Sequence, residues 1–387
     1  MKYCPECGKE LFTQKFCAEC GADISKYTNG GGDSSFNTFD FSSMQAEAQK
    51  QLSEQNEREE FYKNAVIEGT TLKKYKGNEE SIVIPEGITT IAGCALSDCK
   101  AKKITLSSSV SKIEEKGLML YELERIEVDE KSNYFKSIDG VLYSKDGRTL
   151  VQYPQNRGGF YSMPNEVERI DTGALQCVAI SSISLSSRLT KIDDCLLWGS
   201  RINSISIPSN ISSIGKDGFG QCQNLTSITI PGNVVSIGDD AFSCCKALTS
   251  VIVSEGVVSI GKDAFFNCTA LANVTLPDSL RELGGGAFTQ CETLRQISIP
   301  RGMSIIQRRA FSCCRQLTSV ILPEGITSIE EEAFGHSGLK SIKIPYSVQS
   351  INEYAFPYGS SSDKFKFYVP RGRNYGLETY GREFIEY

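Results

Sequence analysis

Aliphatic residues alternate with serine and threonine in short segments that recur along most of the chain. In Ser-Ile-Ser-Ile (204–207) and Ser-Ile-Thr-Ile (227–230), every second residue is aliphatic. This period of two is typical of a β-strand with one buried face. The segments follow one another at steps of 22 or 23 residues, with one interruption. The pattern predicts strands at these pairs: Ile82/Ile84, Ile104/Leu106, Ile126/Val128, Tyr161/Met163, Ile183/Leu185, Ile205/Ile207, Ile228/Ile230, Val251/Val253, Val274/Leu276, Ile297/Ile299, Val320/Leu322 and Ile342/Ile344.

The same succession of elements follows each predicted strand. A turn such as Pro-Glu-Gly (323–325) ends the strand, because proline cannot donate to a strand ladder. A second extended piece comes next, as in Val-Ser-Ile-Gly (235–238), and then a short helical or 3₁₀ turn, as in Asp-Asp-Ala-Phe (239–242). Self-similarity at this period indicates a repeat solenoid, in which twelve coils stack around one continuous core.

Phenylalanine and cysteine each recur every 23 residues through five consecutive repeats, and both are expected in the stacked core. We interpret these cysteines as small buried hydrophobes, because side chains in a parallel ladder point the same way; disulfides remain the alternative. Cys244 and Cys313 lie three repeats apart, too far to pair, and His336 is interpreted as a structural substitution. The two ladders are Phe219, Phe242, Phe265, Phe288 and Phe311, and Cys222, Cys245, Cys268, Cys291 and Cys314.

The solenoid is predicted over 67–387, with atypical segments at its start, its interruption and its end. Residues 67–77 alternate like two short strands about a turn and are expected to cover the first coil. A hairpin insertion is expected near 129–162, where Lys-Asp-Gly (145–147) suits a hairpin turn. The aromatic-rich stretch near 365–387 is predicted to be the closing cap.

The segment Leu-Thr-Ser-Ile-Thr-Ile-Pro-Gly-Asn-Val-Val-Ser-Ile-Gly-Asp-Asp-Ala-Phe, from Leu225 to Phe242, resembles the BspA-like family of bacterial leucine-rich repeats, also called the Treponema pallidum type. The likeness extends from about Gly69 to the C-terminus and includes the interruption. It implies a mainly β solenoid of leucine-rich repeats, with parallel strands and short helical turns. Proteins of this family are often cell-surface adhesins, so the resemblance also implies that alternative function.

The first 24 residues carry a different pattern, which resembles the short zinc ribbons of prokaryotic proteins. Cys-Pro-Glu-Cys-Gly (4–8) is followed by Cys-Ala-Glu-Cys-Gly (17–21), with nine residues between Cys7 and Cys17. Two such knuckles can place four thiolates around a tetrahedral Zn²⁺ and leave no open position, so the metal would be structural. A redox dithiol pair or two disulfides is the alternative. We predict a zinc ribbon over 1–24, with Zn²⁺ held by Cys4, Cys7, Cys17 and Cys20.

Residues 25–66 are predicted to be a flexible linker that includes a short helix. Gly, Ser, Asn and Asp dominate its first half, which is typical of a flexible tether. The helix is expected from Ser42 or Ser43 to about Tyr62, and its polar surface favours a solvated spacer over a coiled-coil partner. Three phenylalanines in the linker are either chance composition or a docking motif: Phe36, Phe39 and Phe41.

Composition and charge narrow the class of function. The 387 residues carry a formal net charge of -6, which argues against nucleic-acid binding by a broad basic surface. The N-terminus has no apolar signal region, and no run is long enough to span a membrane, so we expect a cytoplasmic protein, with the cell surface as a less favoured alternative. A single histidine and no readable nucleophile–base pair indicate that the chain is not an enzyme.

Candidate binding residues lie on the strands and at the aromatic ends. The outward strand residues are mostly Ser, Thr and Asn and are short of the Trp, Tyr and Arg that anchor interfaces, so a solvated face without a ligand is as reasonable as a binding face. Many of the aromatic residues at the insertion and the C-terminus are expected to serve capping. These are Tyr134, Phe135, Tyr143, Tyr153, Phe160 and Tyr161, and Tyr375, Tyr380, Phe384 and Tyr387.

The sequence therefore favours a non-enzymatic protein–protein interaction scaffold. The solenoid would bind one protein partner, and the zinc ribbon a second; no small-molecule substrate is evident. One alternative is a nucleic-acid-associated regulator that touches DNA or RNA through the ribbon, in which case binding would depend steeply on salt. The other is the adhesin that the family resemblance implies.

Overall fold

The computed structural model describes residues 41–359, 364–377 and 381–387. The chain divides into two compact units, Met1–Asn64 and Ala65–Tyr387, which are described separately. In the first unit, the expected helix is α1 (Phe41–Asn64), which is longer than predicted. Its sequence is rich in Gln and Glu and lacks Gly and Pro, so a long helix is locally favoured.

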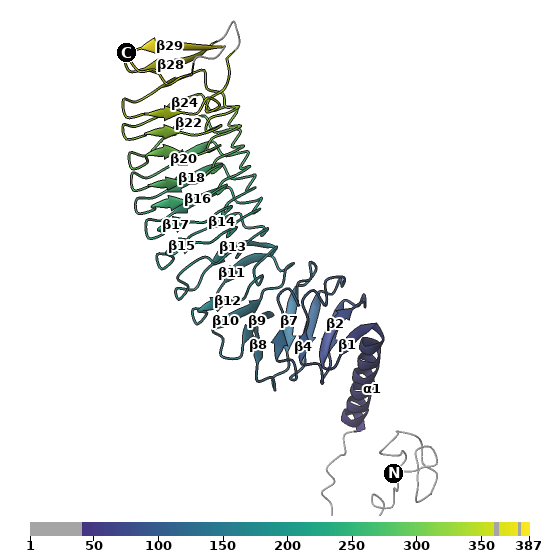
Figure 1. Cartoon of the computed structure of the whole chain (residues 1–387). Helices are drawn as coiled ribbons and strands as arrows, with labels where there is room; N and C mark the ends of the chain where they lie inside the picture. Colours follow the sequence, from purple (N-terminus) through teal and green to yellow (C-terminus); the bar gives the residue numbers. More distant parts are fainter. Residues whose placement is uncertain (1–40, 360–363, 378–380) are drawn as a thin grey trace, which may run out of the picture. The chain divides into compact units, whose positions relative to one another are not determined.

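The second unit is a β solenoid whose coils each contribute strands to two rows (Figure 1). In the first row, each predicted aliphatic pair overlaps a strand, and the strands pair in parallel within successive sheets of two or three strands. The twelve predicted strands are confirmed, and two more follow them. The first row consists of β3 (Ser81–Ile84), β5 (Lys103–Leu106), β7 (Arg125–Val128), β11 (Gly159–Ser162), β13 (Ile180–Ser184), β14 (Ser204–Ile205), β16 (Ser227–Ile230), β18 (Ser250–Val253), β20 (Asn273–Thr275), β22 (Gln296–Ser298), β24 (Ser319–Ile321), β26 (Ser341–Lys343), β28 (Phe365–Val369) and β29 (Arg382–Glu386).

The second row is built from the short extended piece of each coil. Its strands are mostly two residues long and also pair in parallel from coil to coil, as Ser236↔Ser259 and Ile237↔Ile260 show. In most of these strands the second residue is an aliphatic side chain buried in the core, as Ile237 and Ile260 are. The second row consists of β2 (Thr71–Tyr75), β4 (Thr90–Ile91), β6 (Lys112–Ile113), β12 (Arg169–Ile170), β15 (Ser213–Ile214), β17 (Ser236–Ile237), β19 (Ser259–Ile260), β21 (Glu282–Leu283), β23 (Ile305–Ile306), β25 (Ser328–Ile329) and β27 (Ser350–Ile351).

The third side of each coil, called here the turn side, differs from the prediction of short helical turns. Among the described residues of the second unit no helix occurs; 239–244 form consecutive turns instead. Asp240 and Cys244 have left-handed backbone, with φ of 54° and 60°. This alternation turns the N–H groups of Asp240, Phe242 and Cys244 toward the next coil, where they donate to carbonyls at 2.7–2.9 Å. The helical prediction was wrong because these donors bond between coils, whereas a helix would bond them internally.

The same backbone position explains His336. Cys313 lies one repeat before it with φ of 60°, and His336 is exposed with φ of 55°. Histidine belongs to the few side chains enriched in this left-handed region, so it can take the place of Cys313 without changing the turn. The structure thus supports the interpretation of a structural substitution.

A stack of phenylalanine rings runs through the core. Neighbouring rings lie 5.0–5.5 Å apart between centroids, with planes within 12° of parallel. Every ring is at most 1% exposed. The stack is longer than the five predicted members and consists of Phe219, Phe242, Phe265, Phe288, Phe311, Phe334 and Phe356.

The laddered cysteines lie beside these rings, and all are free thiols. Cys245 donates its Sγ–H to the carbonyl of Phe219 in the preceding coil at 3.2 Å, and Cys268 does the same to Phe242 at 3.2 Å. The prediction that they are buried and not joined in disulfides is confirmed. They are more than small hydrophobes, because each thiol satisfies a buried backbone carbonyl.

The insertion is a three-stranded antiparallel meander of β8 (Phe135–Ile138), β9 (Val141–Ser144) and β10 (Thr149–Gln152). Asp139 and Gly140, both left-handed at φ of 49° and 76°, form the first hairpin turn, as an Asp-Gly pair favours. The second turn closes with the N–H of Gly147 donating to the carbonyl of Ser144 at 2.8 Å. β10 then pairs in parallel with β12, so the meander joins the second strand row.

Both ends of the solenoid continue its strand rows. At the start, β1 (Ala65–Glu68) pairs antiparallel with β2, which pairs in parallel with β4. At the other end, β28 and β29 extend the first row in parallel from β26. The segment expected to be a closing cap thus contains two further strands of the first row, one at each of its ends.

Candidate binding surface

The outward side chains of the first strand row form a continuous surface, called here the strand face. Cross-strand register places Thr229, Ile252 and Thr275 side by side, and Ser298 beside Ile321. Most members are short hydroxyl side chains, as the sequence predicted. Ile252 and Ile321 are 45% and 62% exposed, although isoleucine in a half-buried strand normally faces the core.

Exposed apolar side chains gather at the C-terminal end of the strand face. Ile321, Lys343, Tyr346 and Tyr387 line one pocket of about 360 Å³ together with the backbone-bonded Glu324. Its remaining lining residues are Val320, Leu322 and Pro345. We call Ile321, Lys343, Tyr346 and Tyr387 the C-terminal aromatic cluster.

The two tyrosines of this cluster meet edge to face. Their ring centroids lie 5.7 Å apart with planes at 79°, a favourable geometry for aromatic pairs. The Tyr387 hydroxyl donates to the carbonyl of Ile344 at 2.8 Å, which holds the C-terminal residue against the end of β26. The Nζ of Lys343 lies 4.2 Å from the centre of the Tyr387 ring, within the range of a cation–π contact.

The loop beneath the cluster is fixed by charged groups. The Glu324 carboxylate accepts the N–H of Tyr346 at 3.2 Å and that of Ser347 at 3.1 Å. Arg373 donates to the Tyr346 carbonyl at 3.4 Å. Burial, followed by the nearby Tyr346 and Glu324, raises the pKa of Tyr387, so its hydroxyl stays a hydrogen-bond donor at neutral pH.

Most of the aromatic residues named at the insertion as candidate binding residues are buried or half-buried by packing within the solenoid. Tyr143, Tyr153 and Tyr161 are buried; the hydroxyls of Tyr143 and Tyr161 are 2.6 Å apart, and the rings of Tyr153 and Tyr161 are 4.6 Å apart. Phe135 is half-buried. Only Tyr134 and Phe160 of this group are well exposed, at 50% and 66%.

The aromatic residues named at the C-terminus as candidate binding residues differ in their location and burial. Tyr387 is in the cluster, Tyr375 is half-buried, and the ring of Phe384 stacks on Phe367 at 5.2 Å. Tyr380 lies outside the described residues, as do the predicted zinc ligands Cys4, Cys7, Cys17 and Cys20, and the linker residues Phe36 and Phe39.

Tyr346 was missed by the sequence reasoning. It occupies the turn position where other repeats carry a small or charged residue, as in Pro-Gly-Asn (231–233), Pro-Asp-Ser (277–279) and Pro-Glu-Gly (323–325). A tyrosine at a solvent-facing turn position has no role in a solenoid core. The replacement of a small or charged turn residue by tyrosine was the sequence feature that could have identified Tyr346 as a candidate binding residue.

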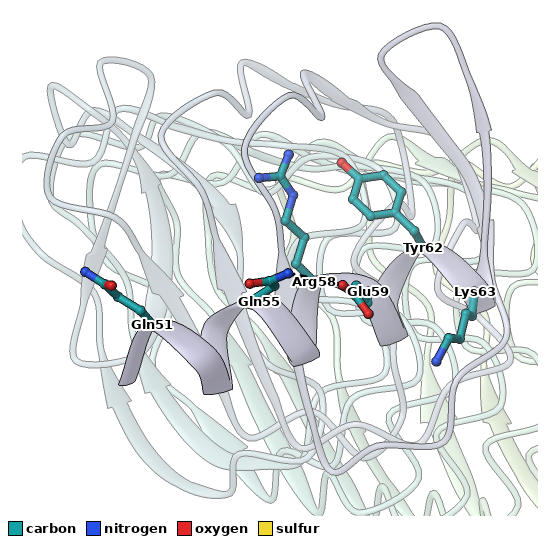
Figure 2. Close-up of a pocket in the computed structure, with 6 residues that line it drawn as sticks. All are labelled: Gln51, Gln55, Arg58, Glu59, Tyr62 and Lys63. Atoms are coloured by element: carbon teal, nitrogen blue, oxygen red, sulfur yellow. Dashed lines mark hydrogen bonds between the residues drawn. The ribbon is translucent and has the colours of Figure 1, made fainter. Parts of the chain in front are cut away.

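A second group of side chains, shown in Figure 2, lies along one helix. Gln51, Gln55, Arg58, Glu59, Tyr62 and Lys63 all come from α1. Their contacts are those of neighbours on a helix surface: Gln55 donates to Glu59 at 3.3 Å, and the Arg58 guanidinium lies 5.9 Å from the Tyr62 ring centre. These contacts account for the side chains as a solvated helix face.

The described residues contain no group of His, Cys, Asp and Glu that could hold a metal ion. Within the same ranges, no helix is long and apolar enough to cross a membrane. The C-terminal aromatic cluster offers two aromatic rings, one exposed aliphatic side chain and one ammonium group, which can bind a ligand through apolar and electrostatic contacts.

Comparison with known proteins identifies the repeats. The model for the BspA type leucine-rich repeat region matches in six copies, over residues 69–144, 160–255 and 235–362. No curated protein matches the sequence significantly.

Several bacterial structures are similar. A leucine-rich repeat protein from Eubacterium ventriosum is 22% identical over 72% of this chain and 64% of its own, with a TM-score of 0.43. A leucine rich cell surface protein from Faecalibacterium prausnitzii is 20% identical over 77% of this chain and 96% of its own, with a TM-score of 0.44. A leucine-rich repeat protein from Bacteroides ovatus is 21% identical over 84% and 97%, with a TM-score of 0.42. The chain thus spans less than two thirds of the first of these.

Proposed function

Because the chain belongs to the BspA-type leucine-rich repeat family, we propose that it is a non-enzymatic scaffold that binds a protein partner through the strand face. The N-terminal zinc ribbon binds a second partner. Solenoids commonly use such extended surfaces for binding, since stacked coils hold many side chains in a fixed array.

One observation carries this proposal. The fold is held by the buried rings, aliphatic residues and thiols, and the outward strand residues take no part in that core. Ile252, Ile321 and Tyr346 nevertheless remain 45%, 62% and 56% exposed. Exposed apolar and aromatic side chains that the fold does not need are typical of a protein interface.

The zinc ribbon rests on the spacing of Cys4, Cys7, Cys17 and Cys20. The free cysteines support a cytoplasmic location. Eleven free cysteines occur among the described residues, and Cys94 is exposed. Exposed free thiols suit a reducing environment, so we place the scaffold in the cytoplasm.

Photo-crosslinking from the strand face tests the binding role. With a benzophenone amino acid at Thr229 or Ser298 of the full chain, we expect discrete crosslinked partners in a lysate of the native host, identified by mass spectrometry. The same probe at Lys262, exposed on the turn side, is the matched control. Equal products from both sides, or none from the strand face, would contradict the proposal.

Substitution of Cys17 and Cys20 with serine tests the metal site. The full-length protein is expected to bind one equivalent of zinc by elemental analysis, and the double variant none. The thermal unfolding of the repeats is expected to be unchanged, since they have their own core. If the full-length wild-type protein binds no zinc, the prediction of a zinc ribbon is wrong. Salt-sensitive nucleic-acid binding lost in the variant would favour the regulator alternative.

A further inference from the structure

We propose that the C-terminal aromatic cluster docks a short acidic segment of a protein partner. One aliphatic side chain of that segment would sit among Ile321, Tyr346 and Tyr387, and an adjacent carboxylate would pair with Lys343. The inference rests on the proposed protein-binding function and specifies where and what the strand face binds.

The apolar half of the site is built from residues that the fold leaves uncovered. Ile321, Tyr346 and Tyr387 are 62%, 56% and 38% exposed and line the same pocket. The two preceding coils carry Ser298 and Thr275 at the equivalent strand position, and Ile252, one coil further back, does not line this pocket. Aromatic side chains around a concave site are the usual anchors of an interface.

The charged half of the site is a single unpaired ammonium. Lys343 contacts the ring of Tyr387, and among the described residues no carboxylate lies within ion-pair distance of its Nζ. Glu324, the only acidic residue lining the pocket, accepts the N–H groups of Tyr346 and Ser347. The pocket therefore offers a cation to a ligand, and its own carboxylate is already engaged.

Together these features favour an acidic aliphatic peptide over a basic one. A carboxylate from a partner can approach Lys343 without displacing a protein carboxylate, and a basic segment would meet like charge. The Tyr387 ring covers one side of the Lys343 ammonium. A carboxylate from the partner must therefore approach this ammonium from the side away from the ring.

The exposed aromatic residues elsewhere do not match this arrangement. At the insertion, the nearby cation Arg157 already pairs with Asp139. Tyr354 and Tyr358 pack on each other, with ring centroids 6.4 Å apart. The C-terminal aromatic cluster combines a pocket, two exposed rings and a cation that has no carboxylate partner among the described residues.

Selection from a phage-displayed library of random 12-residue peptides tests the proposal with the full chain as bait. We expect enrichment of Asp or Glu beside Leu, Ile or Val. Binding of a selected peptide should weaken about tenfold in Tyr346→Ala, by loss of an aromatic anchor, and persist in Tyr346→Phe. Thermal unfolding of each variant shows whether it remains folded. Enrichment of basic peptides would overturn the proposal, and so would a selection that enriches no peptide at all.

A charge exchange makes the test specific for Lys343. In Lys343→Glu, the selected acidic peptide should bind about tenfold more weakly, and its Glu→Lys form should bind better than the original. Lys366→Glu is the matched control, because Lys366 is exposed on the neighbouring strand of the same sheet but lies outside the pocket. Equal loss in both variants would mean that only net charge matters and would refute the docking site.

The two proposals fail separately. Crosslinks from Thr229 or Ser298 without an acidic peptide at the cluster would leave the scaffold function standing and remove this site. Acidic peptide binding that depends on Lys343 and Tyr346 would support the site even where the middle of the strand face yields no crosslink.

Discussion

Replacing Phe265 with alanine is expected to lower the free energy of unfolding by about 3 to 5 kcal/mol. Phe265 is fully buried in the middle of the ring stack. Its centroid lies 5.1 Å from that of Phe242 and 5.1 Å from that of Phe288, so the substitution removes two stacking contacts and leaves a cavity between three coils.

The loss should be transmitted to the neighbouring coils. In a solenoid each repeat is stabilised mainly by its two neighbours, so a gap at Phe265 weakens two interfaces at once. Hydrogen exchange should accordingly speed up at the amides of Phe242 and Cys244, which donate to carbonyls of the coil that carries Phe265.

Urea denaturation followed by circular dichroism measures the effect. Phe160→Ala is the matched control, because Phe160 is 66% exposed, and its loss should change stability by about 0.5 kcal/mol or less. If the two variants unfold alike, or if Phe265→Ala costs less than about 1 kcal/mol, the ring stack is not the core of the solenoid.

The solenoid is also expected to lose stability steeply at alkaline pH. Burial raises the pKa of Cys268 and of Cys314 from 9.0 to about 12. Burial also raises the pKa of Cys291, with neighbouring laddered thiols adding to the effect. Ionisation of these thiols is therefore coupled to unfolding.

The direction of this pH dependence of stability follows from proton binding. A thiol with a raised pKa holds its proton more tightly in the folded protein than in the unfolded chain. Its contribution to stability is complete below about pH 9 and is lost as the pH rises toward 12, by about 1.4 kcal/mol per pH unit for each thiol. Several thiols titrating together should unfold the repeats within this range.

The test is a series of urea midpoints between pH 7 and pH 11. Cys268→Ala should flatten the decline above pH 9, whereas Cys94→Ala should not, because Cys94 is exposed. A midpoint that stays constant up to pH 11 would show that the buried thiols do not control the alkaline limit.

The candidate site was only partly readable from the sequence. The strand face was predicted with its polar character, because strand alternation assigns outward positions directly. Tyr387 was named among many aromatic residues, but its partner Tyr346 was not, since nothing local shows that a residue 41 positions earlier meets it. Conversely, Tyr143 and Tyr161 were named as candidate anchors and proved buried, with the hydroxyl of Tyr143 on β9 2.6 Å from that of Tyr161 on β11.

The sequence by itself determined the repeat, the first and second strands of each coil, and the buried phenylalanine and cysteine ladders. These features follow from a fixed period and from alternation, which act over a few residues and repeat identically. The tertiary structure alone decided the turn side and the binding cluster. Whether the N–H of Phe242 bonds within its own turn or to the next coil, and whether a tyrosine is covered, depends on chain segments that are distant in sequence and meet only when the coils stack.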